Sequence, residues 1–332
     1  FSWIRVRERS KVYVGVNACR LVLQVSLNVL FVVILREGVR GVLYSTLIAN
    51  VLTGVGLTGY VVRELDLAFS ARMTKKMLRF GLPLVATHGA TFVSTFGDRY
   101  FIQQYSDSAE VGIYGLAYKF GFLLVSLGFA PFNLVWQPVR FKLKSHSDRD
   151  AIYSRVHVYF NIVLLSLTVL IGLFAHDVIR IMADPGFHRA SAIVPVILAA
   201  YFLQAWTGFH EVGILVQERT EFMTLANWVG AGVALVGYLL LIPRFGGLGA
   251  AFATLACFGV REAMVYYTSQ KLWQIDYSWK PVGKLLLLGC MIWTPTIWLD
   301  DFRIWSSVSL RLGLFGVYLA GLWYINIIPE GG

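Results

Sequence analysis

Charged and amide side chains recur at helical spacing inside long apolar stretches of this sequence. With 100° between successive residues, one narrow arc of the first stretch carries Asn17, Arg20, Gln24 and Asn28. A second arc carries Asp98 and Arg99, and a third carries Lys119. Cations outnumber acids in these arcs, so the chemistry that they suit is the binding of an anionic ligand with phosphate or sugar groups.

The candidate ligand-binding residues are three cations and the acid beside one of them: Arg20, Asp98, Arg99 and Lys119. Polar and aromatic residues near these positions or on further polar faces are candidates for the lining of the same cavity: Gln24, Asn28, His88, Tyr114, Tyr118, Asn133 and Glu211. Structural roles remain open for several of them. Asp98 could pair with Lys119 as a lock between consecutive helices, Arg20 could reach the cytoplasmic headgroups, and His88 could be a packing residue.

The elements that must position these side chains are ten apolar stretches of about twenty residues, the length that crosses ~30 Å of hydrocarbon as a helix. They lie at 12–35, 39–62, 80–102, 111–136, 156–174, 191–216, 222–242, 248–268, 282–299 and 307–327. They lack the alternation of barrel strands. An ionised side chain at the bilayer centre costs about 2.5–3.5 kcal/mol, so the polar arcs must face a protein interior. The sequence predicts an all-α, polytopic membrane protein with about 10 transmembrane helices.

The net charge of +10 is divided among short loops, which argues against a nucleic-acid partner. Alternate loops hold eighteen and six Lys and Arg residues. Because basic loops stay on the cytoplasmic side, we expect both ends of the chain in the cytoplasm, and residues 107, 185 and 301 outside. Binding of anionic headgroups by these loops would be secondary.

Enzyme and metal motifs are absent from the sequence. The cysteines, Cys19, Cys257 and Cys290, lie inside the stretches and have no CxxC or Cys/His ligand spacing, so we expect them to be buried apolar residues. His210 and Glu211 lie close to a cytoplasmic end and could be solvated there, and Ile214 occupies the place of the second histidine of a zinc motif. The glycines at 246–249 predict a turn and close helix packing rather than a nucleotide site. We therefore expect no cofactor, no metal and no catalytic residue.

Four short blocks, in this order, resemble the polysaccharide biosynthesis/export family, specifically its Wzx-like oligosaccharide flippases within the multidrug/oligosaccharidyl-lipid/polysaccharide exporter superfamily. The blocks are FGLPL at 80–84, DRYFI at 98–102, VGIYGLAYK at 111–119 and IPRFGGLGAA at 242–251. The resemblance covers nearly the whole chain. The family's Asp-Arg pair and Lys correspond to Asp98, Arg99 and Lys119, whereas Arg20 rests on its polar arc alone.

The resemblance implies twelve to fourteen helices in two six-helix lobes around a central cavity. On that register helices one to four are missing from this chain. Residues 1–69 would then be a remnant of the first lobe, 70–270 the second lobe, and 271–332 two additional helices.

The function implied by the resemblance is that of the complete protein. It would flip an undecaprenyl-diphosphate-linked oligosaccharide across the bacterial cytoplasmic (inner) membrane for O-antigen, capsule or exopolysaccharide synthesis. Its partners would be membrane lipid, this lipid-linked substrate, and a polysaccharide polymerase or export machinery.

Three other functions remain open. A lipid II flippase would share the cationic interior. A cation-coupled multidrug exporter would favour an acidic one. A membrane glycan polymerase or ligase would carry a large outer loop, whereas the longest here is about 176–190.

Overall fold

The computed structural model describes residues 10–64, 70–143, 148–293 and 304–324, except for some side chains, among them those of 75–76 and 79–88. Within these ranges the chain is helical almost throughout, and no strand occurs there. The expected all-α membrane fold is confirmed. By its internal contacts the chain divides into two compact units, Phe1–Arg79 and Phe80–Gly332. The expected three-part division at 69/70 and 270/271 stays a prediction.

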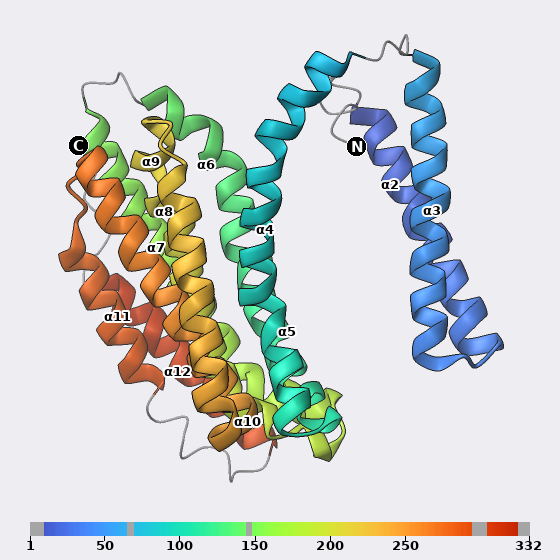
Figure 1. The fold of residues 1–332 in the computed structure, drawn as a ribbon. Coiled ribbons are helices and arrows are strands. Elements are labelled where there is room, and N and C mark those ends of the chain that lie inside the picture. Colours follow the sequence, from blue (N-terminus) through green and yellow to red (C-terminus); the bar gives the residue numbers. More distant parts are fainter. Residues whose placement is uncertain (1–9, 65–69, 144–147, 294–303, 325–332) are drawn as a thin grey trace. The chain divides into compact units, whose positions relative to one another are not determined.

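The first unit contains an antiparallel helix pair (Figure 1). Helix α2 (Ser10–Asn28) runs into a π-helical turn (Val29–Ile34), and α3 (Gly38–Glu64) follows. The chain reverses through left-handed backbone at Arg36 (φ 54°) and Gly38 (φ 53°). Gly41 lets the two helices approach, because a Cβ there would lie 3.0 Å from Phe31.

The second unit is a helical bundle (Figure 1). Helix α4 (Ala71–Tyr105) begins before the boundary between the two units, and its residues from Phe80 onward belong to the second unit. After a short turn, α5 (Ser108–Leu124) begins where the Asp107 carboxylate accepts the Glu110 N–H at 2.8 Å. A π-helical turn (Val125–Phe129) joins α5 to α6 (Ala130–Lys142).

The later helices build the core of this bundle. Helix α7 (Arg149–Met182) is followed by a 3₁₀ turn (Pro185–Phe187), then by α8 (Ala190–His210) and the short α9 (Val212–Val216). Helix α8 packs against α5, α7 and α10, while α11 (Trp279–Trp293) and α12 (Ile304–Tyr324) pack on α7.

Helix α10 (Glu221–Leu272) is a hairpin of two arms. The chain folds back at Gly246, whose φ of 55° and ψ of −133° are not helical. The arms touch at Gly237, where a Cβ would lie 2.6 Å from that of Ala253, and at Gly249, where it would lie 2.3 Å from the Leu241 carbonyl oxygen. The turn and the close packing expected from the glycine cluster are therefore present.

Among the described residues, six helical segments are long and apolar enough to cross a membrane, judged by length and composition. One of them is the whole α10 hairpin, which contains two of the expected stretches. Val308–Trp323 is a shorter apolar helix. The count of about ten spans stays a prediction.

Candidate functional site

Asp98 is fully buried and holds a hydrogen-bond network that joins α4 to α5. Its Oδ1 accepts the backbone N–H of Arg99 at 2.8 Å and pairs with the Arg99 guanidinium at 3.1 Å. Its Oδ2 accepts the Tyr114 hydroxyl at 2.6 Å, and that hydroxyl lies 3.4 Å from the hydroxyl of Thr254 on α10. Both oxygens of the carboxylate are thus engaged by a cation and two neutral donors.

Arg99 is the part of this network that remains accessible. Its side chain is 27% exposed, and its guanidinium donates to the Thr95 carbonyl at 3.0 Å. It also lies 4.6 Å from the ring centroid of the buried Tyr118. The hydrogen bonds from the Arg99 side chain to Asp98 and to the Thr95 carbonyl use the same nitrogen, Nη1, so the other N–H groups of the guanidinium can bind a ligand.

Lys119 lies on a different face of α5 from Tyr114 and Tyr118, and its side chain is exposed on the second unit. In the described part of the chain Asp98 forms its ion pair with Arg99 and not with Lys119. The structure therefore does not contain an Asp98–Lys119 pair between α4 and α5. Ser126 and Gln137 are exposed further along α5–α6. Half-buried Asn133 lies between them in sequence, and its Oδ1 is buried with no hydrogen-bond partner among the described residues.

In the first unit, Arg20 is half-buried and lines two cavities of about 410 and 270 Å³ between α2 and α3. Of the three amides on the same arc, Asn17 donates to the Tyr13 carbonyl within α2, and the other two join α2 to α3. Gln24 Nε2 donates to Thr46 at 3.4 Å, and Asn28 accepts the Ser45 hydroxyl. The expected function of Arg20 together with the residues of the second unit stays a prediction.

His210, which could have been solvated, is buried, and its two ring nitrogens contact Glu262 and His157 at 2.6 and 3.2 Å. Glu211 is partly exposed and pairs with buried Arg140 at 3.2 Å, and its place in the lining of a cavity stays a prediction. The side chain of His88 lies outside the described residues.

Sequence reasoning also missed a buried ion pair between α7 and α12. Arg311 Nε lies 3.4 Å from Asp177 Oδ2, and the Arg311 guanidinium donates to the Leu173 carbonyl. Both side chains are almost fully buried. The available signal was a lone arginine in the last apolar stretch. Of the cysteines, Cys257 is buried as expected, but Cys19 and Cys290 are exposed.

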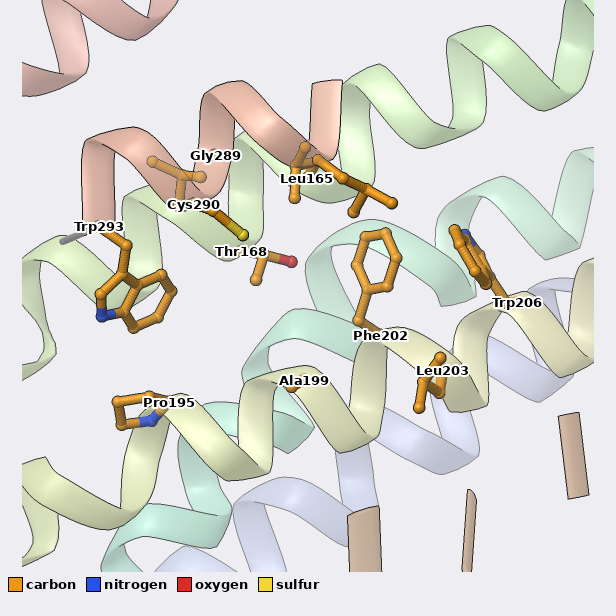
Figure 2. Close-up of a pocket in the computed structure, with 12 residues that line it drawn as sticks. Leu165, Thr168, Pro195, Ala199, Phe202, Leu203, Trp206, Gly289, Cys290 and Trp293 are labelled. Atoms are coloured by element: carbon orange, nitrogen blue, oxygen red, sulfur yellow. The ribbon is translucent and has the colours of Figure 1, made fainter. Parts of the chain in front are cut away.

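An apolar cavity of about 520 Å³ lies between α7, α8 and α11. Figure 2 shows Trp293 and Trp206 toward opposite ends of it, with Phe202 between them. Its lining holds no charged side chain, so it suits hydrocarbon rather than the anionic ligand expected near Arg99.

A family model described as polysaccharide biosynthesis protein matches residues 8–192. The uncharacterized membrane protein MJ1068 of Methanocaldococcus jannaschii is 22% identical over 278 residues, covering 78% of this chain and 52% of that protein. The chain thus spans about half the length of the curated relative it matches. Lipid II flippase MurJ, in an inward closed conformation, matches at a TM-score of 0.70 and 13% identity, over 92% of this chain and 67% of that one. At this identity the likeness concerns the fold.

Proposed function

Because the chain belongs to the polysaccharide biosynthesis protein family, we propose that it acts as a flippase for an undecaprenyl-diphosphate-linked oligosaccharide. The lipid would move from the cytoplasmic to the outer leaflet of the bacterial inner membrane and supply surface polysaccharide synthesis. A polymerase or export machinery would receive it there. The chain would be a transporter rather than an enzyme, with both of its ends in the cytoplasm.

The observation that carries this proposal is the exposed Lys119 in a membrane-spanning helix. Lys119 lies about 16 Å along α5 from Ser108, at 1.5 Å per residue, which is near the middle of ~30 Å of hydrocarbon. A lysine in lipid at that depth costs about 2.5–3.5 kcal/mol. An exposed lysine there therefore supports a polar path along this face of α5.

Arg99 and Lys119 would bind the diphosphate of the lipid. Arg99 offers a planar fork of N–H donors, whereas Lys119 offers a compact charge on a flexible chain. Asp98 would be a positioning residue, because it holds the Arg99 guanidinium and lowers the net positive charge of the path. Too strong a field would trap the anion. Arg20, in the inner half of its helix on the expected topology, would help to receive the diphosphate from the cytoplasmic side.

The test is flipping of a labelled lipid by the purified protein in vesicles. The substrate is undecaprenyl-diphosphate-linked oligosaccharide with a fluorophore on its sugar, and a membrane-impermeant reductant bleaches the label in the outer leaflet. We expect the protein to expose the inner-leaflet label to the reductant. An equally labelled phospholipid should stay protected.

Lipid II, the substrate named for the solved neighbour, is the comparison substrate in the same assay. If lipid II is flipped faster than the oligosaccharide lipid, lipid II would be the substrate in place of the oligosaccharide lipid. Protection of both lipids at the level of protein-free vesicles would contradict a flippase altogether.

A further inference from the structure

Three titratable side chains from three helices form one buried hydrogen-bonded row in the second unit. Glu262 of α10 contacts His210 of α8, with 2.6 Å between Oε1 and Nδ1. His210 then contacts His157 of α7, with 3.2 Å between the two Nε2 atoms. Both imidazoles are almost fully buried, and Glu262 is 7% exposed. This row lies outside the Asp98 network and has no part in the proposed binding of the diphosphate.

The contact between the two Nε2 atoms fixes how protons can be arranged. One of these nitrogens must carry a proton and the other must accept it. In the first arrangement His157 donates to His210, and His210 Nδ1–H donates to the Glu262 carboxylate, so the row holds two protons. In the second, Glu262 is protonated and donates to His210 Nδ1, and His210 Nε2–H donates to His157. His157 is then protonated on Nδ1, and the row holds three.

The two arrangements differ by one proton and by the direction of both hydrogen bonds. A proton that arrives at His157 Nδ1 pushes the Nε2 proton to His210, whose Nδ1 proton passes to Glu262. The two outer atoms of the row, His157 Nδ1 and Glu262 Oε2, are buried and have no hydrogen-bond partner among the described residues. They are the atoms at which a proton would enter and leave.

The surroundings of the row favour its exchange of a proton. Aromatic rings surround the imidazoles, with centroid distances of 4.8 Å from His157 to Tyr277, 5.1 Å from His157 to Trp279 and 5.1 Å from His210 to Tyr266. Such rings stabilise an imidazolium as the proton passes. Trp206 and Phe209 of α8 complete the enclosure.

The other ionisable groups near the row balance one another. Arg261 interacts with both Glu262 and Glu211, and Glu211 pairs with Arg140. With both histidines neutral and Glu262 ionised, the charges of Arg140 and Arg261 balance those of Glu211 and Glu262. Tyr277 lies between α10 and α11 with Tyr153, Tyr266 and Asp150 nearby, and burial raises the pKa of its hydroxyl, so it stays neutral.

We propose that Glu262, His210 and His157 form a binding site for one exchangeable proton, whose arrival reverses the hydrogen bonds that tie α10, α8 and α7 together. The site requires no transported lipid, so it goes beyond the proposed function. The proton changes the local charge by one and changes which helix donates to which. Proton occupancy is therefore linked to the contact between these three helices.

The test is the protonation pattern of the imidazoles in the protein, labelled with ¹⁵N-histidine and held in lipid bilayers with a metal chelator. Solid-state NMR reports which ring nitrogen carries the proton from about pH 4 to about pH 10, a range that brackets ordinary histidine titration. At high pH we expect His157 protonated on Nε2 and His210 on Nδ1. At low pH we expect the reverse, with both residues changing at one common midpoint.

Fixed patterns for both histidines over the whole range, or two separate midpoints, would overturn the proposal. The variant Glu262→Gln removes the carboxylate that takes the proton, so the common transition should vanish. The matched control is His188→Gln, at a histidine after the 3₁₀ turn, which should leave the transition unchanged. Persistence of the transition in Glu262→Gln would also count against the site. If that variant fails to fold, the titration of the unaltered protein still decides.

Discussion

Ionised side chains in the second unit occur in two environments that predict different consequences of mutation. Asp177 and Arg311 are almost fully buried together. Lys119 is exposed, and Arg99 is partly exposed beside a buried Asp98. A buried pair is costly to break because one charge is then left without compensation. An exposed cation in a spanning helix is available to a ligand, and its removal should leave folding intact.

Arg311→Met should lower the stability of the folded protein strongly. Removing one partner of a buried ion pair costs about 3–5 kcal/mol, whereas replacing both by apolar residues is often close to neutral. Denaturant unfolding in detergent checks this, with Arg311→Met/Asp177→Leu as the comparison. Equal stability of the single variant and the unaltered protein would show that the pair does not hold α12 to α7.

Tyr114→Phe should destabilise the protein by about 1–2 kcal/mol, because Asp98 Oδ2 loses a buried donor at 2.6 Å. The matched control is Tyr100→Phe on α4, at a ring that is 69% exposed. The shift of the midpoint in thermal unfolding measures both. Equal shifts for the two variants would contradict the assigned hydrogen bond.

At the scale of elements, the α10 hairpin depends on glycines that no side chain can replace without movement of the backbone. Gly246 adopts positive φ, and Gly249 faces the Leu241 carbonyl. The Glu110 carboxylate of α5 accepts the Gly247 N–H at 2.9 Å and so caps the second arm. These contacts fix how the two arms meet and where Thr254 lies opposite Tyr114.

Gly249→Ala should reduce the amount of folded protein and its thermal midpoint, because a Cβ there would lie 2.3 Å from a backbone oxygen. Gly232→Ala on the first arm is the control, since nothing lies within 4 Å of a Cβ at that position. That change should be neutral or slightly stabilising, because alanine favours helix by about 1 kcal/mol over glycine. The reverse order of the two variants in thermal unfolding would refute the close approach of the arms.

Periodicity and length were enough to predict the helices and the hairpin, but not the partners of polar residues. Asp98 pairs with Arg99, its neighbour on the predicted polar arc, and with Tyr114, rather than with Lys119 as the alternative of a lock between helices required. Arg140 lies between two of the predicted apolar stretches, at 111–136 and 156–174, yet it is buried against Glu211. A sequence gives the direction of each side chain on its own helix. It does not give the rotation of that helix against its neighbours, which decides where His157, His210 and Glu262 meet.

At the scale of the whole molecule, the loops carry the information about orientation in the membrane. Their asymmetry of eighteen to six basic residues predicts which ends of the helices face the cytoplasm. On this topology the Asp98 network lies toward the outer side and the row of Glu262, His210 and His157 toward the inner side.

Single cysteines in a background without Cys19, Cys257 and Cys290 should show this orientation. We expect an impermeant thiol reagent added outside intact cells to label Asp107→Cys and to leave Asp148→Cys unlabelled until the membrane is permeabilised. Both positions are exposed in the structure. Labelling of position 148 alone in intact cells would show that the topology is the reverse of the predicted one. The Asp98 network would then lie toward the inner side, and the row of Glu262, His210 and His157 toward the outer side.

The central claim is that a cationic path along α5 carries an anionic lipid, and the flipping rate of Lys119 variants in vesicles tests it most directly. Lys119→Met should slow flipping of the labelled oligosaccharide lipid at least about tenfold, equivalent to about 1.4 kcal/mol in the barrier. Lys119→Arg keeps the charge and should retain most of the rate. Lys142→Met, at the end of α6, is the control and should flip normally in equally folded protein. Flipping by Lys119→Met at the rate of the unaltered protein would contradict the cationic path.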